Sequence, residues 1–344
     1  MATEATSLDT RPKDCLNTIR IITAICVLYR HTIAHLSIEI PGFITDIMSY
    51  FPGVPIFFSL SGFLMWGSIG RSPNFIQYLK KRFWSIYPQL WLAIFIEIAV
   101  LLAFYRSPIN WTELSLFTIT QGTIFQFWTP DSLRGYGCGC PNGSLWTICV
   151  IIQYYLVAYF LYKSLHGRKT LIWTAAIALS ILIGLLSPYI ESSLPTILGK
   201  LYSQTLLPYL WMFLTAACIA ENKECLLHIL QRYWYLFIIA TILIRLLHID
   251  LSLGNYPLLQ TITTFAGLLG ASRVFPYLNI KTNISYGIYL YHMTVVNALI
   301  SLHYSGSPWL LLVVIMFTCT LAYLSQKTVG EWSLSSKSRL STTR

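Results

Sequence analysis

The stretch Arg20-Ile-Ile-Thr-Ala-Ile-Cys-Val-Leu-Tyr-Arg-His31 is the first long apolar segment of the chain, and the interpretation of the rest depends on it. It carries three ionisable side chains, those of Arg20, Arg30 and His31. An ionisable group at membrane depth is costly and usually marks a functional site. The stretch therefore predicts a membrane-embedded site near the start of the chain.

The spacing within this stretch places two of these groups on one helix face. Arg20 and His31 are eleven residues apart, which at about 100° per residue is roughly three turns plus 20°. The two side chains would then lie about 16 Å apart along the helix. A cation and an imidazole at this spacing suit a long substrate with an anionic head and a reactive tip. The alternative is an arginine that extends to the membrane surface and a buried histidine bonded to a backbone carbonyl.

The composition predicts a membrane protein over the whole length of the chain. Of the 344 residues, 55% are hydrophobic and only 10% are charged, whereas a soluble domain has about 25% charged residues. The mean hydropathy is +0.61. A net charge of +10 would suggest nucleic acid in a soluble protein, but basic residues beside membrane spans explain it better, so no nucleic-acid partner is expected. The first dozen residues lack the apolar core of a signal peptide.

Ten segments are long and apolar enough to cross about 30 Å of hydrocarbon as helices. They lie near residues 16–38, 48–70, 83–105, 144–163, 170–188, 204–220, 233–249, 256–272, 283–302 and 307–326. The sequence thus predicts an all-α fold, a polytopic membrane bundle of about ten transmembrane helices. Residues 1–14 would form a cytoplasmic N-terminal tail, residues 15–328 the transmembrane domain, and residues 329–344 a cytoplasmic C-terminal tail.

The distribution of basic residues predicts the orientation. With the N-terminus in the cytoplasm, 17 Lys and Arg residues lie in cytoplasmic segments, and three, Arg106, Arg134 and Lys200, lie outside. Cytoplasmic loops of membrane proteins are enriched in Lys and Arg. Both termini are therefore expected in the cytoplasm, and a bacterial inner membrane is the expected location of this multi-pass protein.

One predicted connection, the outer loop 106–143, is much longer than the others. Asn110 or Thr112 is placed to cap a short helix within it. Further along the loop, Cys138 and Cys140 form a strained bridge, pair elsewhere or remain free thiols. A metal site is not expected there, because only one pair of ligands with suitable spacing is present.

Five motifs, in order along the chain, resemble those of the acyltransferase-3 family of integral membrane O-acyltransferases. They are Arg20 with His31, GVPIFFSLSGF at 53–63, KRFWSIYP at 81–88, NGSLWT at 142–147 with QYY at 153–155, and ISYGIYLYH at 284–292. Each motif alone is weak, but five in this order over nearly the whole chain are a strong signal. The resemblance implies transfer of an acyl group, usually acetyl, from acyl-CoA to a carbohydrate hydroxyl.

The resemblance makes His31 the catalytic histidine, and the chemistry of imidazole agrees. A hydroxyl needs a base to become a nucleophile, and a neutral imidazole suits that role. The donor, acetyl-CoA or another acyl-CoA, is expected at Arg20 and the basic segment Lys80, Lys81 and Arg82, which Tyr87 follows, because arginine suits phosphate contacts. The alternative for the basic segment is ordinary anchoring at the cytoplasmic surface.

Two further groups of residues are candidates for the reaction. His292 drifts along one side of a helix with Tyr286 and Tyr289, and these three are predicted to line the same cavity as His31; the alternative is a buried histidine in an aromatic stripe. The residues Asn142, Ser144 and Trp146 are predicted to bind the acceptor at the outer membrane boundary, although a tryptophan there is commonly an interface anchor.

Two positions depart from the family pattern. Ser85 stands where the family usually has a second arginine in its basic segment, and Ile151 stands where it usually has a glutamate. Either other residues compensate, or activity is reduced or lost. Glu97, deep in the third span, is the spare carboxylate that is predicted to be catalytic; its alternative role is a structural ion pair with Arg30 or another cation.

The sequence as a whole predicts a membrane O-acetyltransferase that acts on a glycan or glycolipid, with a tunnel from a cytoplasmic CoA site to His31. Its expected partners are acyl-CoA, the acceptor and the lipid bilayer, without a metal, and the oligomeric state is left open. One rival interpretation is a transporter for a lipid-linked sugar or small solute. The other is a degenerate homologue that binds without catalysis, for which Ser85 and Ile151 are the motivation.

Overall fold

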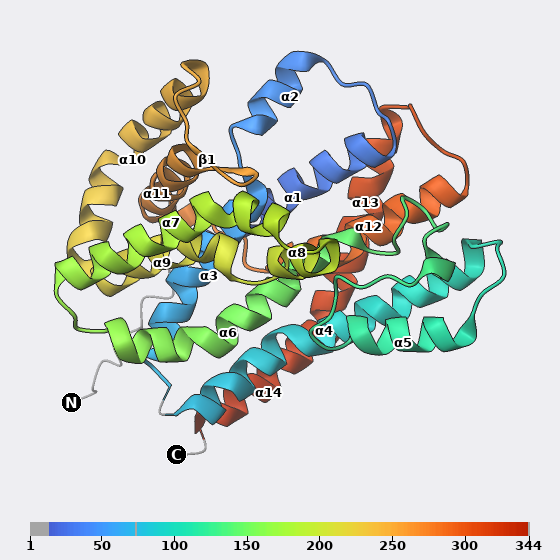
Figure 1. Ribbon diagram of the computed structural model, residues 1–344, viewed down its shortest axis with the longest axis horizontal. Helices are drawn as coiled ribbons and strands as arrows, with labels where there is room; N and C mark the ends of the chain where they lie inside the picture. The colour runs from blue at the N-terminus through green and yellow to red at the C-terminus, as the bar shows by residue number, and fades with distance from the viewer. Residues whose placement is uncertain (1–13, 73, 343–344) are drawn as a thin grey trace, which may run out of the picture.

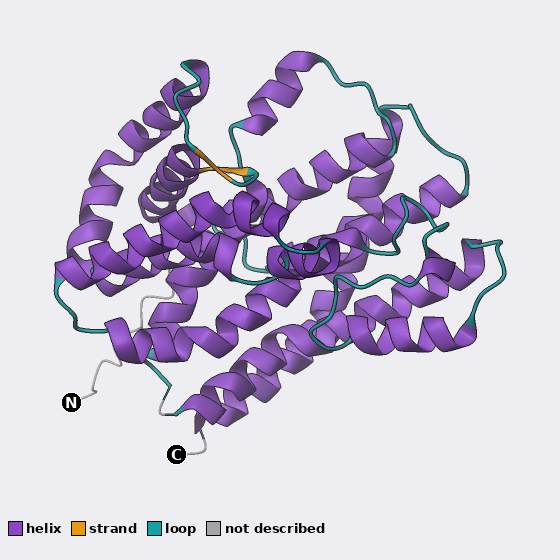
Figure 2. Ribbon diagram, in the orientation of Figure 1, coloured by secondary structure: helices purple, strands orange, loops and turns teal. Residues whose placement is uncertain are grey.

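The computed structural model describes residues 14–72 and 74–342, with the side chains of 338–342 excepted, and this part of the chain is almost entirely helical (Figures 1 and 2). Its α-helices are α1 (Leu16–His35), α2 (Gly42–Ser49), α3 (Gly53–Ile69), α4 (Phe75–Phe104), α5 (Trp111–Gln121), α6 (Trp146–Leu165), α7 (Thr170–Ser193), α8 (Thr196–Ser203), α9 (Leu210–Glu221), α10 (Lys223–Leu246), α11 (Leu258–Val274), α12 (Ser285–Ser301), α13 (Trp309–Ser325) and α14 (Glu331–Thr342).

Shorter elements connect these helices. They are the 3₁₀ turns η1 (Asp131–Leu133), η2 (Gly143–Leu145), η3 (Leu207–Tyr209) and η4 (Pro276–Leu278), the π turn η5 (Gln326–Gly330), and the antiparallel strands β1 (Ser252–Leu253) and β2 (Tyr256–Pro257). The all-α prediction is confirmed.

Each of the ten predicted spans coincides with a helix, but the described residues contain six helices that are long and apolar enough to cross a membrane. These are Gly42–Ile69, Phe75–Phe104, Gly143–Leu165, Thr170–Ser193, Lys223–Leu246 and Trp309–Lys337. Three of them join consecutive elements: α2 with α3, η2 with α6, and α13 with η5 and the first part of α14. A seventh is added if Thr196–Ser203 and Leu207–Glu221, bent by 43° at their break, form one span. The α11 and α12 helices have 17 residues each, and α1 contains two arginines and two histidines. A count of ten crossings therefore stays a prediction.

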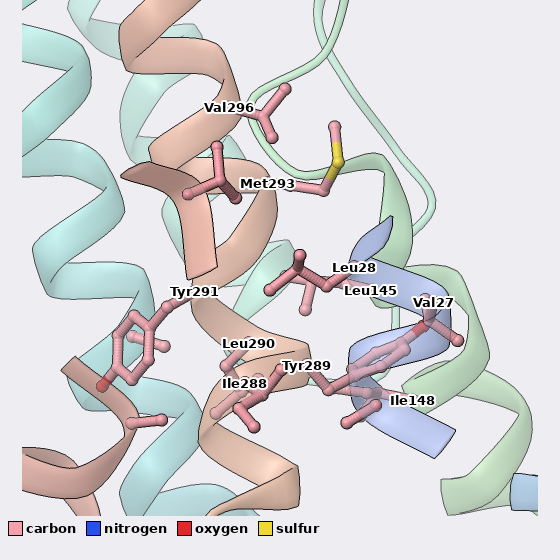
Figure 3. Close-up of a cluster of buried hydrophobic side chains, with 14 of the residues drawn as sticks. Val27, Leu28, Leu145, Ile148, Ile288, Tyr289, Leu290, Tyr291, Met293 and Val296 are labelled. Atoms are coloured by element: carbon pink, nitrogen blue, oxygen red, sulfur yellow. The ribbon is translucent and has the colours of Figure 1, made fainter. Parts of the chain in front are cut away.

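Helix α12 lies at the centre of the largest apolar core (Figure 3). Val27 and Leu28 of α1 and Ile148 of α6 belong to this core. Figure 3 shows Tyr289 reaching from α12 toward α1 and the start of α6, whereas Tyr291 points to the other side of the helix. One face of α12 therefore packs against α1 and the start of α6, and its opposite face packs against other helices of the bundle.

Close helix contacts depend on two glycines. A Cβ on Gly62 of α3 would lie 2.2 Å from the backbone oxygen of Phe213 in α9, and a Cβ on Gly287 of α12 would lie 2.7 Å from the Cα of Ala322 in α13. Small residues allow helix backbones to approach one another in membranes. The backbones of α3 and α9, and those of α12 and α13, therefore approach closely at these two glycines.

The segment that follows α13 forms a helix that returns along α4. Helix α14 lies beside the first half of α4 (Figure 1). The hydroxyl of Ser333 donates a hydrogen bond to the backbone carbonyl of Trp84, and the rings of Trp84 and Trp332 meet edge to face with centroids 5.1 Å apart. Residues from the predicted C-terminal tail are therefore packed against the membrane domain.

The long outer loop is folded onto the bundle. Asn110 caps α5, because its side-chain oxygen accepts hydrogen bonds from the backbone N–H groups of Thr112 and Glu113, as the sequence predicts. Near the end of the loop, Asn297 of α12 accepts a hydrogen bond from the N–H of Cys138 and donates one to the carbonyl of Cys140. One buried amide therefore fixes the loop to the helix that carries His292.

Candidate active site

Two histidines from distant parts of the chain meet between α1 and α12. The Nδ1 atom of His31 lies 3.4 Å from the Nε2 atom of His292, and their ring centroids are 5.1 Å apart. His31 is partly buried, and only 1% of His292 is exposed. The sequence places both imidazoles near one cavity, and the structure places them in direct contact.

The hydrogen-bond partners of His292 define its tautomer. Its Nδ1 atom lies 2.9 Å from the carbonyl oxygen of Tyr289 and 3.2 Å from that of Ile288. Carbonyl oxygens only accept hydrogen bonds, so Nδ1 of a neutral His292 carries the proton and Nε2 carries the lone pair. His292 therefore presents an acceptor to His31.

The same reasoning defines the tautomer of His31. Its Nδ1 atom faces the Nε2 acceptor of His292 and, at 3.2 Å, the sulfur of Met293, which is also an acceptor. Because both neighbours of Nδ1 are acceptors, Nδ1 carries the proton of the neutral ring. The Nε2 atom of His31 is then unprotonated and is the basic nitrogen of the pair.

A network of buried polar groups lies beside the histidines. The side-chain nitrogen of Asn142 donates to Glu97 Oε2 at 3.3 Å and to the carbonyl of Leu290 at 2.9 Å. The side-chain oxygen of Asn142 accepts from Ser144 Oγ at 2.7 Å. The hydroxyl of Tyr289 bonds to Thr147 Oγ1 and to the carbonyl of Ser144. The network therefore joins α4, the end of the outer loop and α12.

Glu97 is buried in this network, with 1% of the residue exposed. Its Oε2 accepts from Asn142, and its Oε1 has no hydrogen-bond partner among the described residues. No ion pair within residues 14–72 and 74–342 involves Glu97 or Arg30. The carboxyl group holds Asn142 and, through it, the loop that approaches α12.

A basic cavity of about 300 Å³ lies beside the first halves of α4 and α12 and the first part of α14. Its lining contains three cationic residues, Arg20 of α1, Arg82 of α4 and Lys337 of α14, and no acidic residue among those described. The Nε atoms of Arg20 and Arg82 are buried, and the described part of the chain offers them no hydrogen-bond acceptor. We call this space the basic cavity.

Tyr289 borders both the basic cavity and the histidine pair. Ile148, Ile151, Tyr286 and Tyr289 line the cavity, and neither His31 nor His292 is part of its lining among the described residues. The ring centroid of Tyr289 is 5.8 Å from that of His292. The two predicted tyrosines therefore line the cavity, and the two histidines lie next to Tyr289 outside that lining.

The five residues predicted for the donor site separate into two groups. Arg20 and Arg82 line the basic cavity, and Lys80, Lys81 and Tyr87 are outside its lining. Lys80 is exposed. The hydroxyl of Tyr87 donates to the carbonyl of Thr123 in the outer loop, 3.2 Å away. Helix periodicity explains the difference, because positions 80, 81 and 87 point away from the face that carries Arg82.

A second, larger space lies on the side of the outer loop. This loop cleft has a volume of about 530 Å³, and Asn142, Trp146, Cys138 and Cys140 line it. Trp146 packs on the ring of Tyr209, with centroids 5.5 Å apart. Trp146 lines the loop cleft and the adjacent Thr147 lines the basic cavity, so the start of α6 borders both spaces.

Several residues of the site are not evident from sequence motifs. Lys337 lies near the C-terminus, where it counts only as one more basic residue of a predicted tail. Met293 and Asn297 follow His292 on α12 and contact His31 and the outer loop. Asn297 lies four positions after Met293, so the two share one face of α12, whereas their separations from His292, of one and five positions, give no such signal. Among the described residues, no group of three His, Cys, Asp or Glu side chains is arranged to hold a metal ion.

The fold and the site define a class of protein, an integral membrane helical bundle with a pair of imidazoles in contact beside a basic cavity. A family model described as an acyltransferase domain matches residues 13–326, and the chain belongs to this acyltransferase family. A protein named Nodulation protein 10 from Rhizobium leguminosarum bv. viciae is 29% identical in an alignment of 344 positions that covers 89% of each chain. No solved structure gives a significant match. The protein is therefore a membrane acyltransferase.

Proposed function

We propose that the protein moves an acetyl group from acetyl-CoA to a hydroxyl of a cell-surface glycan or glycolipid. The donor would enter the basic cavity from the cytoplasm of a bacterial cell, where both chain termini would also lie. The acceptor would enter from the loop cleft. The observation that carries this proposal is the contact between His31 and His292, near a cavity whose described lining holds three cationic residues and no acidic residue.

His31 would act as the general base of a direct transfer. Its Nε2 takes the proton of the acceptor hydroxyl while the oxygen attacks the thioester carbonyl, and a tetrahedral intermediate forms. The carbon–sulfur bond then breaks, and the His31 imidazolium returns the proton to the thiolate. The products are an acetyl ester and CoA, so protons and electrons balance without a further reactant. General acid–base catalysis of this kind typically contributes about 10²–10⁴-fold to the rate.

His292 would be a positioning residue in this reaction. Its Nε2 accepts the Nδ1–H of His31, which holds the ring in the tautomer that leaves Nε2 free. The same hydrogen bond stabilises the imidazolium that forms when His31 takes a proton. The Met293 sulfur, a weak acceptor, would add little to this.

Glu97 and the acceptor-site residues would act through position rather than by direct proton transfer. The carboxyl group of Glu97 and the hydroxyl of Ser144 hold Asn142 in place. Trp146 offers an aromatic face to the loop cleft, and a sugar ring would stack on it. Tyr286 and Tyr289 line the basic cavity and would contact the acyl arm of the donor.

Transfer of label from acetyl-CoA tests the proposed function directly. The purified protein is incubated with acetyl-CoA labelled in the acetyl group, with and without candidate glycans, and both free thiol and labelled glycan are measured. We expect release of CoA that depends on the acceptor, with one labelled ester formed for each thiol. Solute movement into liposomes without any thioester turnover would instead identify a transporter.

A further inference from the structure

Lys337 reaches the position at which this chain departs from its family. The ammonium group of Lys337 donates a hydrogen bond to Ser85 Oγ at 2.8 Å, although the two residues are 252 positions apart. Helix α14 brings it there by packing along α4 (Figure 1). A cation from the C-terminal helix therefore stands where the family resemblance leads one to expect a second arginine on α4.

The setting of Lys337 is a cluster of like charges. Lys337, Arg20 and Arg82 all line the basic cavity, and no ion pair found within residues 14–72 and 74–342 involves any of them. The Arg82 guanidinium lies over the rings of Tyr78 and Tyr155, at 5.2 and 5.4 Å from their centroids. Cations brought together without anions repel one another and attract an anionic ligand.

The donor geometry of the cluster also points to an anion. An ammonium group has three N–H donors, and the hydrogen bond to Ser85 uses one of those of Lys337. The Nε atoms of Arg20 and Arg82 are buried and have no acceptor among the residues that the structure describes. An acceptor-rich anion in the cavity would satisfy all three residues at once, and phosphate groups are the usual ligands of such sets of Arg and Lys.

The rest of the cavity suits the remainder of such a ligand. Ile148, Ile151 and Phe57 also line the cavity and give it apolar surface. Ile151 stands where the family usually has a glutamate, so no carboxylate at that position opposes an anion in the cavity. The cavity thus combines cationic and apolar lining residues.

We propose that Lys337 is a third cation of the donor site, which binds the diphosphate of acyl-CoA together with Arg20 and Arg82. The C-terminal helix α14 is then part of the donor site and takes over the role of an arginine that α4 lacks. This inference rests on the proposed function, because it names the residue that completes the site for the same donor. An anionic lipid offers the same phosphate chemistry, and the experiment separates the two sources.

The test is a direct binding measurement on the full-length protein in nanodiscs of phosphatidylcholine. The variant Lys337→Gln keeps the length of the side chain and removes the charge. The matched control is Lys327→Gln, since Lys327 is paired with Glu331 at 2.7 Å and is outside the lining of the basic cavity. Titrations use coenzyme A and, separately, pantetheine, which lacks the diphosphate; a thermal melt of each variant confirms folding.

We expect Lys337→Gln to weaken coenzyme A binding by about 10-fold or more, the usual loss for one charge-assisted hydrogen bond. Pantetheine binding and the Lys327→Gln control should be unchanged. Adding Ser85→Arg to Lys337→Gln should restore binding, because it returns a cation to the same place. If this double variant does not fold, the single variant and its control still decide the question.

Two results would overturn the inference. Wild-type affinity for coenzyme A in folded Lys337→Gln would show that Lys337 is a structural contact of α14. A loss confined to the binding of phosphatidylglycerol, titrated separately into the same phosphatidylcholine nanodiscs, with coenzyme A binding unaffected, would show a lipid site. If the wild-type protein itself binds no coenzyme A, the proposed donor fails, and that outcome is distinct from a failure of Lys337 alone.

Discussion

Replacing His292 separates the positioning of His31 from the binding of the donor. His292→Leu places an apolar side chain of similar volume at a position where only 1% of the histidine is exposed. It removes the acceptor 3.4 Å from His31 Nδ1. A hydrogen bond to a charged group contributes about 1.5–3 kcal/mol. Loss of this bond to the His31 imidazolium that forms during the reaction should lower kcat by about 10–150-fold, at 1.36 kcal/mol per tenfold.

The assay is acetyl transfer measured over a range of acetyl-CoA concentrations, so that kcat and KM separate. We expect kcat to fall and KM to stay constant, since His292 is outside the lining of the basic cavity. His292→Gln should keep much of the rate, because its amide oxygen accepts the same hydrogen bond. The matched control is Met293→Leu, which removes only the weak sulfur acceptor and should change kcat little.

Two results for His292→Leu would contradict the positioning role of His292. Unchanged kcat in a folded His292→Leu protein would show that the contact between the two imidazoles has no part in the reaction. A rise in KM with unchanged kcat would place His292 in the donor site instead. A melting temperature within a few degrees of wild type is the condition for either interpretation.

Three further predictions follow from the cavities and the loop. Arg20→Ala and Arg82→Ala should each raise the KM for acetyl-CoA by about 10–150-fold, because each removes a charge-assisted bond to the donor, whereas Lys327→Ala should not; equal KM values in steady-state kinetics would make both arginines surface anchors only. The neighbouring thiol of Cys140, a hydrogen-bond partner, lowers the pKa of Cys138 below that of an ordinary thiol, so an impermeant maleimide added from outside should label Cys138 faster at pH 7 than an ordinary thiol, and the rate should fall as the pH is lowered. Labelling from the cytoplasmic side alone would reverse the proposed topology. Tyr289→Phe removes the hydroxyl that joins Thr147 to the loop, and we expect acetyl-CoA hydrolysis without acceptor to rise relative to transfer; an unchanged ratio of thiol release to ester formation would contradict this.

Local patterns in the sequence predict the helices and one face of the site. The eleven-residue spacing of Arg20 and His31 places them along one side of α1, and the structure puts the first in the basic cavity and the second against α12. The cap at Asn110 follows from the residues next to it. These features depend on neighbours within a few turns, which is why the sequence alone predicts them.

Contacts between distant helices are not predictable in the same way. The pair His31 and His292 joins residues 261 positions apart, and the pair Ser85 and Lys337 joins residues 252 apart. Helix periodicity says which side chains share a face but not which helix covers that face. Lys337 lies in a segment with the polar composition of a solvated tail, and only the packing of α14 on α4 shows that it lines a cavity.

The measurement that tests the central claim most directly is acetyl transfer by His31→Ala. The variant is purified in membranes alongside the wild type, its folding is checked by thermal melting, and labelled ester is measured with saturating acetyl-CoA and acceptor. The account predicts a fall of at least about 10²-fold, the lower end of what a general base contributes, while coenzyme A binding stays within a few-fold of wild type. A folded His31→Ala protein that transfers acetyl at the wild-type rate would contradict the account.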